Sequence, residues 1–439
     1  MHVTMYYTIM PDGTVKQVNP FTGTEVWAVA GRRSKPTFND VQREPQKLER
    51  HTPEDYCSFC QACYYETAPE KARLIRHPDG RWEQLTRLAP DTYFDTTAEF
   101  RRLGNLFEIV TLEYWRKNYA YKMTAVQQRW KEEYLANPTG LKHVTDIINY
   151  KLQREGKTEE QMEKLTMAER FALADAFFSG CHEMIIARRH YKDNAEFDTD
   201  LYSSGEMTLE EHFQYFRFTI DAMRDVFASN RYVRYISVFQ NWLRPAGASF
   251  DHLHKQIVAI DEWGSSIEQQ TKMIRDDPNV YNQFGANFAA HHNLVFAEND
   301  YALAFAGIGH RFPTIEIYSK SQAGRPYEHT DEEIRGISNL VHAIHAAMGS
   351  QISCNEEWYY TPVDAVYKMP WHVLIKWRVT VPAGFEGGTG IFINPMTPIE
   401  LRDRMVPRLY KLRDEGKIDR IRIAEECRVD PNPLKYYLR

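Results

Sequence analysis

The chain has 439 residues, of which 43% are hydrophobic and 26% are charged, and its formal net charge at pH 7 is −6. This length allows a substantial core in one large domain or in two or three ordinary ones. The negative charge excludes the basic surface of a non-specific nucleic-acid binder. No apolar run approaches the roughly 20 residues that span a bilayer, and the amino terminus lacks a signal-peptide pattern. We therefore expect a cytoplasmic protein with no nucleic-acid or membrane partner; its six cysteines are too sparse for a disulfide framework.

The predicted elements begin with short strands between residues 6 and 30, a cysteine-bearing loop at 55–70 and a strand near 103–112. Residues 113–180 are charged and have helical spacing, which indicates a helical insertion between two strands. Simple packing is the plainer interpretation of this insertion, and a cap over a site or a dimer contact is the alternative. The later elements are a strand at 182–187, a helix at 209–227, strands at 233–239, 257–260, 301–307 and 314–319, a helix at 331–348, a strand at 371–379 and a helix at 398–412.

A faint internal repeat runs through these elements. A strand–strand–helix–strand order with a histidine in its last strand ends once at 252–260 and again at 371–379. The pattern indicates a duplicated α+β unit in which only the first copy keeps the full histidine motif.

The first chemical motif is Cys57-Ser58-Phe59-Cys60, followed by Cys63. A C-x-x-C pair is half of a zinc site or a redox pair. Because this pair lies in a loop rather than opening a helix after a buried strand, zinc is the favoured interpretation. Histidines are then expected to complete the site, and Cys63 is a possible substitute ligand; the histidine candidates are His182, His190, His252 and His254.

The second motif is the segment His252-Leu253-His254-Lys255-Gln256, which follows the small-residue turn Pro245-Ala246-Gly247-Ala248-Ser249. On a strand, residues two apart point to one face, so His252, His254 and Gln256 are expected to share a surface. A neutral imidazole is a good nucleophile toward an α-phosphorus. We predict His254 as this nucleophile, with Gln256 donating to a phosphoryl oxygen and Ser249 holding a more distant phosphate. Two purely structural histidines are the alternative.

A third, weaker signal is the basic cluster of Arg32, Arg33 and Lys35. It is a candidate for binding a substrate phosphate, although basic surface clusters without such a role are common.

Taken together, these residues resemble galactose-1-phosphate uridylyltransferase and its relatives in the histidine-triad superfamily. The closest resemblance is in the central block, from Phe239-Gln240-Asn241 through the turn to the histidine motif. Looser similarity covers most of the chain outside the insertion, namely the cysteine loop with Thr67-Ala68-Pro69-Glu70, the basic segment 32–36, the base-binding strand at 102–107, the strand from His182 to His190, and residues 382–394.

The resemblance implies an α+β fold in which two histidine-triad-like halves, residues 1–270 and 271–439, form a largely antiparallel sheet flanked by helices. It also implies a homodimer and the nucleotide-sugar chemistry known from galactose metabolism. The implied zinc is structural and is held at one site by Cys57, Cys60, His190 and His252. The implied catalytic and binding residues are His254 as the nucleotidylated residue, Gln256 and Ser249 at the phosphates, Arg32 and Lys35 in the basic loop, and Asn105 and Asn241 at the nucleotide.

This chain departs from the family pattern in three places. Leu253 stands where the family has proline between the histidines, and the glutamine that contacts the sugar phosphate is not found near Met396. Tyr360 and Pro370 stand where histidines of a second metal site are expected, leaving His372, so we expect that site to be absent.

The sequence therefore predicts a nucleotidyltransferase that moves a nucleoside monophosphate from a nucleotide-sugar-like donor to a phosphorylated small-molecule acceptor. The alternative is a phosphorylase or hydrolase that acts on a nucleotide-sugar or dinucleoside polyphosphate with the same histidine. A zinc-stabilised nucleotide-binding protein without turnover is the third hypothesis.

Overall fold

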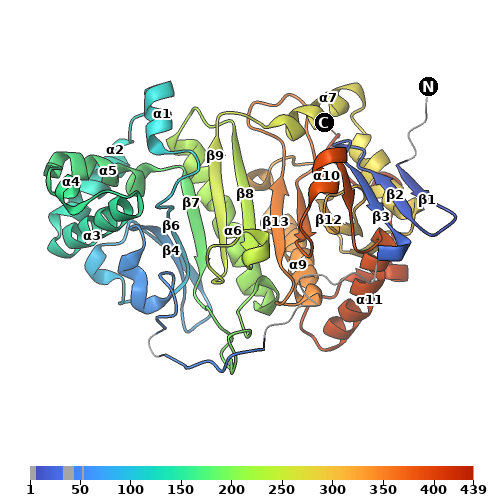
Figure 1. Cartoon of the computed structure of the whole chain (residues 1–439), viewed down its shortest axis with the longest axis horizontal. Coiled ribbons are helices and arrows are strands. Elements are labelled where there is room, and N and C mark those ends of the chain that lie inside the picture. The colour runs from blue at the N-terminus through green and yellow to red at the C-terminus, as the bar shows by residue number, and fades with distance from the viewer. Residues whose placement is uncertain (1–5, 33–43, 52–53, 439) are drawn as a thin grey trace.

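The centre of the fold is a twelve-stranded sheet, seen in a computed structural model that describes residues 6–32, 44–51 and 54–438 (Figure 1). Neighbouring strands in this sheet all pair antiparallel, which confirms the predicted fold class. From one edge to the other, the strands are β16 (Arg422–Ile423), β10 (Val295–Glu298), β11 (Ala302–Ala306), β12 (Thr314–Ser319), β14 (His372–Trp377), β13 (Cys354–Tyr359), β8 (Tyr235–Trp242), β9 (His254–Ile260), β7 (His182–Ala187), β6 (Ala98–Gly104), β4 (Glu70–Arg76) and β5 (Trp82–Thr86).

The strands on the two sides of the β8–β13 pair repeat one order of elements. The first copy runs β6, β7, α6 (Leu209–Ser229), β8 and β9, and the second runs β11, β12, α9 (Asp331–Met348), β13 and β14. His254 begins β9 and His372 begins β14, so the two histidines hold corresponding positions. The duplicated pattern is confirmed, whereas the boundary at residue 270 stays a prediction.

The sequence analysis missed β13 and misplaced the end of β6. Two consecutive glutamates make β13 look polar, and the partners that allow Glu356 to be buried come from distant segments. The strand predicted near 103–112 is wrong beyond Gly104, where β6 ends. There the side-chain oxygen of Asn105 accepts a hydrogen bond from the Phe107 backbone N–H at 2.9 Å, which turns the chain out of the sheet.

Each of the two long helices begins with a capping box. The Thr208 hydroxyl accepts from the Glu211 backbone N–H, and the Glu211 carboxylate accepts from the Thr208 N–H in return. Thr330 and Glu333 make the same reciprocal pair before α9, as the sequence predicts for Thr330. The two helices pack against each other and help to enclose the main hydrophobic core.

The predicted helical insertion is confirmed, and it lies at one end of the molecule (Figure 1, left). It has its own hydrophobic cluster, which also includes Phe59 of the cysteine loop and Leu103 of β6. The insertion is therefore packed against the elements that carry the predicted site. Its helices are α1 (Leu112–Tyr119), α2 (Ala125–Ala136), α3 (Pro138–Arg154), α4 (Glu159–Glu163) and α5 (Met167–Ser179).

A four-stranded sheet lies at the opposite end of the molecule and joins early and late segments of the chain (Figure 1). In spatial order it contains β1 (Tyr7–Ile9), β2 (Val15–Val18), β3 (Glu25–Ala28) and β15 (Ile391–Ile393), with β15 parallel to β3. None of the helices in the described part of the chain combines the length and the apolar character needed to cross a bilayer. The remaining helices are α7 (Ser265–Asp276), α8 (Asn287–His291), α10 (Gly384–Thr389) and α11 (Pro398–Asp414).

A fully buried ion pair links the two copies of the repeat. Lys255 Nζ on β9 lies 2.6 Å from Glu356 Oε1 on β13. The Glu356 carboxylate also accepts hydrogen bonds from His345 Nε2 at 2.9 Å and from Trp358 Nε1 at 2.7 Å. Although burial alone raises the pKa of Glu356, the charge of Lys255 holds that pKa well below its usual range. The carboxylate is therefore ionised and depends on Lys255 for its counter-charge.

We expect Lys255→Met to lower the free energy of unfolding by about 3–5 kcal/mol, because it leaves a buried carboxylate without its cation. The neighbouring pair of Lys376 and Glu357 is the matched control, with the same Nζ–O distance of 2.6 Å but with side chains 22% and 27% exposed. Lys376→Met should lower the free energy of unfolding by no more than about 1 kcal/mol. Urea unfolding measures both values, and equal losses would contradict the assigned role of burial.

Candidate active site

Four side chains from three separate segments form a candidate metal centre. Cys57 and Cys60 come from the loop before the short helix η2 (Gln61–Glu66), His190 follows β7, and His252 precedes β9. One ligand atom from each residue lies within 4.8 Å of the other three. The two sulfurs are 3.8 Å apart, the separation that two Zn–S bonds of about 2.3 Å give at a tetrahedral ion. This group could bind one metal ion.

The orientation of His252 agrees with such a role. Its Nε2 donates to the Ala187 carbonyl oxygen at 2.7 Å, so the neutral ring carries its proton there. Its unprotonated Nδ1 then faces the cysteines, 3.4 Å from Cys57 Sγ and 3.7 Å from Cys60 Sγ. A hydrogen bond that fixes the tautomer of a ligating histidine is typical of metal centres. Cys63, His182 and His254, which the sequence left open as ligands, do not belong to the group of four.

His254 lies next to this centre with its ring held in one tautomer. Nδ1 donates to the backbone oxygen of His252 at 2.8 Å, which leaves Nε2 with the lone pair of the neutral ring. Burial lowers the pKa of His254 to about 4, and the side chain is only 5% exposed. The ring is therefore neutral near pH 7 and offers Nε2 as a nucleophile.

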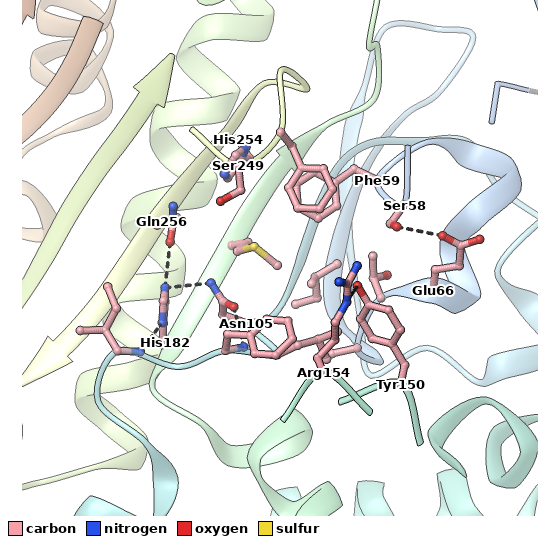
Figure 2. A pocket seen from close by; sticks show the side chains of 18 of the residues that line it. Ser58, Phe59, Glu66, Asn105, Tyr150, Arg154, His182, Ser249, His254 and Gln256 are labelled. Carbon is pink, nitrogen blue, oxygen red and sulfur yellow. Dashed lines mark hydrogen bonds between the residues drawn. The ribbon is translucent and has the colours of Figure 1, made fainter. Parts of the chain in front are cut away.

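A cavity of about 580 Å³ is lined by His254 and by Gln256, two positions further along β9. This volume lies within the range of small-molecule sites, about 300–1,000 Å³. Apolar side chains on β6, on β7 and in the loop after β6 form part of its wall, and they are Leu103, Leu106, Phe107, Ile109 and Met184. Some of its polar side chains, His182, Ser249 and Gln256, lie on the side of His254, and others, Ser58, Glu66, Tyr150 and Arg154, lie farther from it (Figure 2). The cavity thus combines an apolar wall with polar side chains, as small-molecule sites do.

The small-residue turn before the histidine motif approaches the cavity. Gly247 has a φ of +89°, a left-handed conformation that glycine adopts without strain. Gly247 and Ser249 both line the cavity, and Ser249 lies beside His254 (Figure 2). Ser249 is exposed and lines the cavity, where a phosphate could accept from its hydroxyl.

Gln256 makes a hydrogen bond to a histidine that the sequence analysis considered only as a metal ligand. His182 Nε2 lies 2.9 Å from Gln256 Oε1 and 3.1 Å from Asn105 Nδ2 (Figure 2). Both carboxamides line the cavity together with His182. The structure therefore brings Asn105, Ser249, His254 and Gln256 together around one space.

The insertion contributes the opposite wall through α3. Tyr150 and Arg154 line the cavity, and Arg154 Nε donates to the Tyr150 hydroxyl at 3.2 Å. His143 on the same helix fixes this placement, because its Nε2 donates to the Thr67 carbonyl oxygen at 2.8 Å. Among the described residues that line the cavity, Arg154 is the single lysine or arginine.

Two of the predicted binding residues that the structure describes, Asn241 and Arg32, are not found in the wall of this cavity. Asn241 Oδ1 accepts instead from Asn355 Nδ2 on β13, at 2.7 Å. Arg32 ends a short turn after the small sheet, away from the cavity, and is exposed. Lys35 lies outside the described residues. The assignment of these three residues to phosphate or nucleotide stays a prediction.

Sequence reasoning missed Arg154, Tyr150 and the contact of His182 with Gln256. The only available signal for His182 was its place on a strand flanking the motif, since diagonal neighbours on paired strands can touch. In the observed register, Gln256 pairs with Met184, two positions from His182. No local pattern pointed to Arg154 or Tyr150, because their position depends on how the insertion docks.

Two solved structures have a fold similar to that of this chain. An ADP-glucose phosphorylase from Arabidopsis thaliana with bound ADP-glucose superimposes with a TM-score of 0.54 at 16% identity, over 89% of this chain and 97% of that one. A GalT-like protein from the same plant gives a TM-score of 0.53 at 16% identity, over 89% and 98%. The resemblance inferred from the sequence is thus confirmed at the level of the fold.

A search of curated protein sequences finds no match. A family model does match, over residues 10–436, which is nearly the whole chain. The chain accordingly belongs to the family described as "Domain of unknown function (DUF4921)".

Proposed function

We propose that this protein moves a nucleoside monophosphate from a nucleotide-sugar-like donor to a phosphorylated small-molecule acceptor through a nucleotidyl-His254 intermediate. The observation that carries the proposal is the lone-pair Nε2 of His254, on a ring that lines a nucleotide-sized cavity. Gln256 and Ser249 stand beside it as donors for phosphoryl oxygens. A binding protein without turnover has no need for a neutral, oriented imidazole at this position.

The proposed reaction has two displacements at one phosphorus. In the first, Nε2 of His254 forms a bond to the α-phosphorus while the bond to the leaving oxygen breaks and the sugar phosphate departs. The positive charge on the imidazole is stabilised by the Nδ1–H donated to the His252 carbonyl oxygen. In the second, a phosphate oxygen of the acceptor attacks the same phosphorus, the N–P bond breaks and the neutral ring returns.

We further propose that the metal bound by Cys57, Cys60, His190 and His252 is a structural zinc ion. Two thiolates with two imidazoles are a common set for structural zinc. When bound, the ion would hold the turn at His252, and hence the carbonyl oxygen to which His254 donates. The four ligands leave no open position for a substrate.

The apolar wall of the cavity suits the nucleoside. Leu106 and Met184 can pack against a base, while Asn105 provides a polar group at the same wall. The homodimer that the family resemblance implies stays a prediction.

Arg154 is positioned to bind an anionic part of the substrate, because it is the one lysine or arginine among the described residues that line the cavity. We expect Arg154→Ala to raise KM for the nucleotide donor or the acceptor roughly 5–10-fold, about 1–1.4 kcal/mol, with a smaller effect on kcat. Lys142→Ala is the control, since Lys142 is exposed on the same helix and pairs with Asp146. Steady-state kinetics measure both, and equal KM values for wild type and Arg154→Ala would remove Arg154 from the binding site.

Phosphorolysis is a second candidate, in which inorganic phosphate takes the nucleotidyl group from His254. It is supported by the fold shared with a protein named as an ADP-glucose phosphorylase. The atoms of this step balance, because nucleotidyl-histidine and phosphate give a nucleoside diphosphate and free histidine.

Exchange experiments test the proposed function and separate its two forms. Radiolabelled hexose 1-phosphate should enter the nucleotide-sugar pool with no third reactant, because the first displacement is reversible. With labelled inorganic phosphate, a phosphorylase transfers the label into nucleoside diphosphate, whereas a strict transferase does not. Absence of both exchanges for uridine, adenosine and guanosine donors would overturn the proposal.

A further inference from the structure

His182 lies between two carboxamides and can satisfy only one arrangement of hydrogen bonds. Its Nε2 is within reach of Gln256 Oε1 and of Asn105 Nδ2, and its Nδ1 is 3.0 Å from the backbone nitrogen of Ile109. The side chain is 1% exposed, so bulk water does not provide the missing partners.

The Ile109 contact decides the tautomer. A backbone N–H can only donate, so Nδ1 of His182 must accept and carries no proton. A neutral imidazole has one N–H, which is then on Nε2. Burial also lowers the pKa of His182, which keeps the ring neutral.

With Nε2 as a donor, the orientation of Gln256 follows. Its Oε1 accepts from His182 at 2.9 Å, so its NH₂ group is turned away from His182. In Figure 2 that nitrogen points toward Ser249 and His254. Because the Asn105 NH₂ group also lies beside this N–H, the reverse orientation of Gln256 would leave the N–H of His182 between two donors.

Asn105 cannot accept this N–H. Asn105 Oδ1 is engaged by the Phe107 backbone N–H at 2.9 Å, which fixes the amide. Its NH₂ group lies 3.1 Å from Nε2 of His182, and because Nε2 carries the ring N–H, this contact gives that N–H no acceptor.

We propose that His182 is a positioning residue that turns the NH₂ group of Gln256 toward the phosphoryl group attacked by His254. The inference rests on the proposed function and adds a residue to it. His182 does not contact the reacting atoms; it acts by holding the Gln256 amide in the one orientation that donates to a non-bridging oxygen in the transition state.

The variants His182→Asn and His182→Gln separate this role from simple packing. Asparagine can keep the Ile109 contact but is too short to donate to Gln256, whereas glutamine places an NH₂ group near the former Nε2. We expect His182→Asn to slow formation of nucleotidyl-His254 about 10–100-fold with little change in donor KM. His182→Gln should recover most of that loss.

A double-mutant cycle with Gln256→Ala gives the sharper result. If His182 acts through Gln256, His182→Asn should slow the reaction less than 2-fold further in the Gln256→Ala background. Equal slowing in both backgrounds, or no rescue by His182→Gln, would reduce His182 to a structural residue. Metal content and urea unfolding of each variant verify that the fold is kept.

The tautomer of His182 can also be measured directly in the wild-type protein. NMR of ¹⁵N-histidine-labelled protein should show His182 protonated at Nε2 and not at Nδ1, and the opposite tautomer would overturn the inference. If wild-type protein forms no nucleotidyl adduct, the proposed function itself fails. If the adduct forms at the wild-type rate in His182→Asn, only the role of His182 fails.

Discussion

Replacing His254 with alanine should reduce nucleotidyl transfer by more than about 10³-fold, because the group that forms the bond to phosphorus is removed. The fold and the metal content should be unchanged, since the His254 side chain hydrogen-bonds to the nearby His252 carbonyl oxygen and is not in the group of four ligands. Initial rates with saturating donor and acceptor, together with metal analysis, measure these effects.

The second copy of the repeat provides a matched control at His372. This histidine begins its strand as His254 does, and its Nδ1 donates to the Pro370 carbonyl oxygen at 2.9 Å. It lines a cavity of only about 70 Å³, too small for a nucleotide. His372→Ala should therefore keep turnover near the wild-type level. Full activity in His254→Ala, or loss of activity in a folded His372→Ala, would show that the catalytic histidine is wrongly assigned.

Cys57→Ser should remove the metal and destabilise the protein. The hydroxyl is a poor substitute for a thiolate, and metal binding in such a site is coupled to folding. We expect the bound zinc to fall from about one ion per chain to a small fraction of that value. The free energy of unfolding should fall by more than about 3 kcal/mol. Inductively coupled plasma mass spectrometry and urea unfolding measure the two quantities.

Cys63→Ser is the control for this loss. Cys63 lies three residues after Cys60 but does not belong to the group of four ligands. The Cys63→Ser protein should keep its zinc content and its free energy of unfolding. A Cys57→Ser protein with full zinc, or equal zinc loss in both variants, would contradict the ligand set.

The cysteine pair and the histidine motif were predictable because short-range spacing determines their geometry, whereas His190 and His252 were assigned as ligands only through the family resemblance. Cys57 and Cys60 are close enough in sequence to reach one ion, and His254 and Gln256 are two apart on one strand. Capping residues such as Thr330 were predictable for the same reason, since the capping box is a local pattern.

The rest of the site depends on contacts between distant segments. Arg154 reaches the cavity because α3 docks through buried contacts such as that of His143 with the Thr67 carbonyl oxygen. Asn241 is bound by Asn355 on β13, a strand whose buried Glu356 made its segment look polar in the sequence. Neither the docking of α3 nor the contact between Asn241 and Asn355 can be predicted from a short window of residues.

The central claim is that a nucleotide becomes covalently bound to His254. Its most direct test is intact-protein mass spectrometry of zinc-loaded protein after brief incubation with UDP-glucose, ADP-glucose, GDP-mannose and diadenosine tetraphosphate. We predict an acid-labile adduct of one nucleoside monophosphate that peptide mapping places on His254, and its mass will identify the nucleoside. Absence of any adduct across this panel, or an adduct on another residue, would contradict the proposed mechanism.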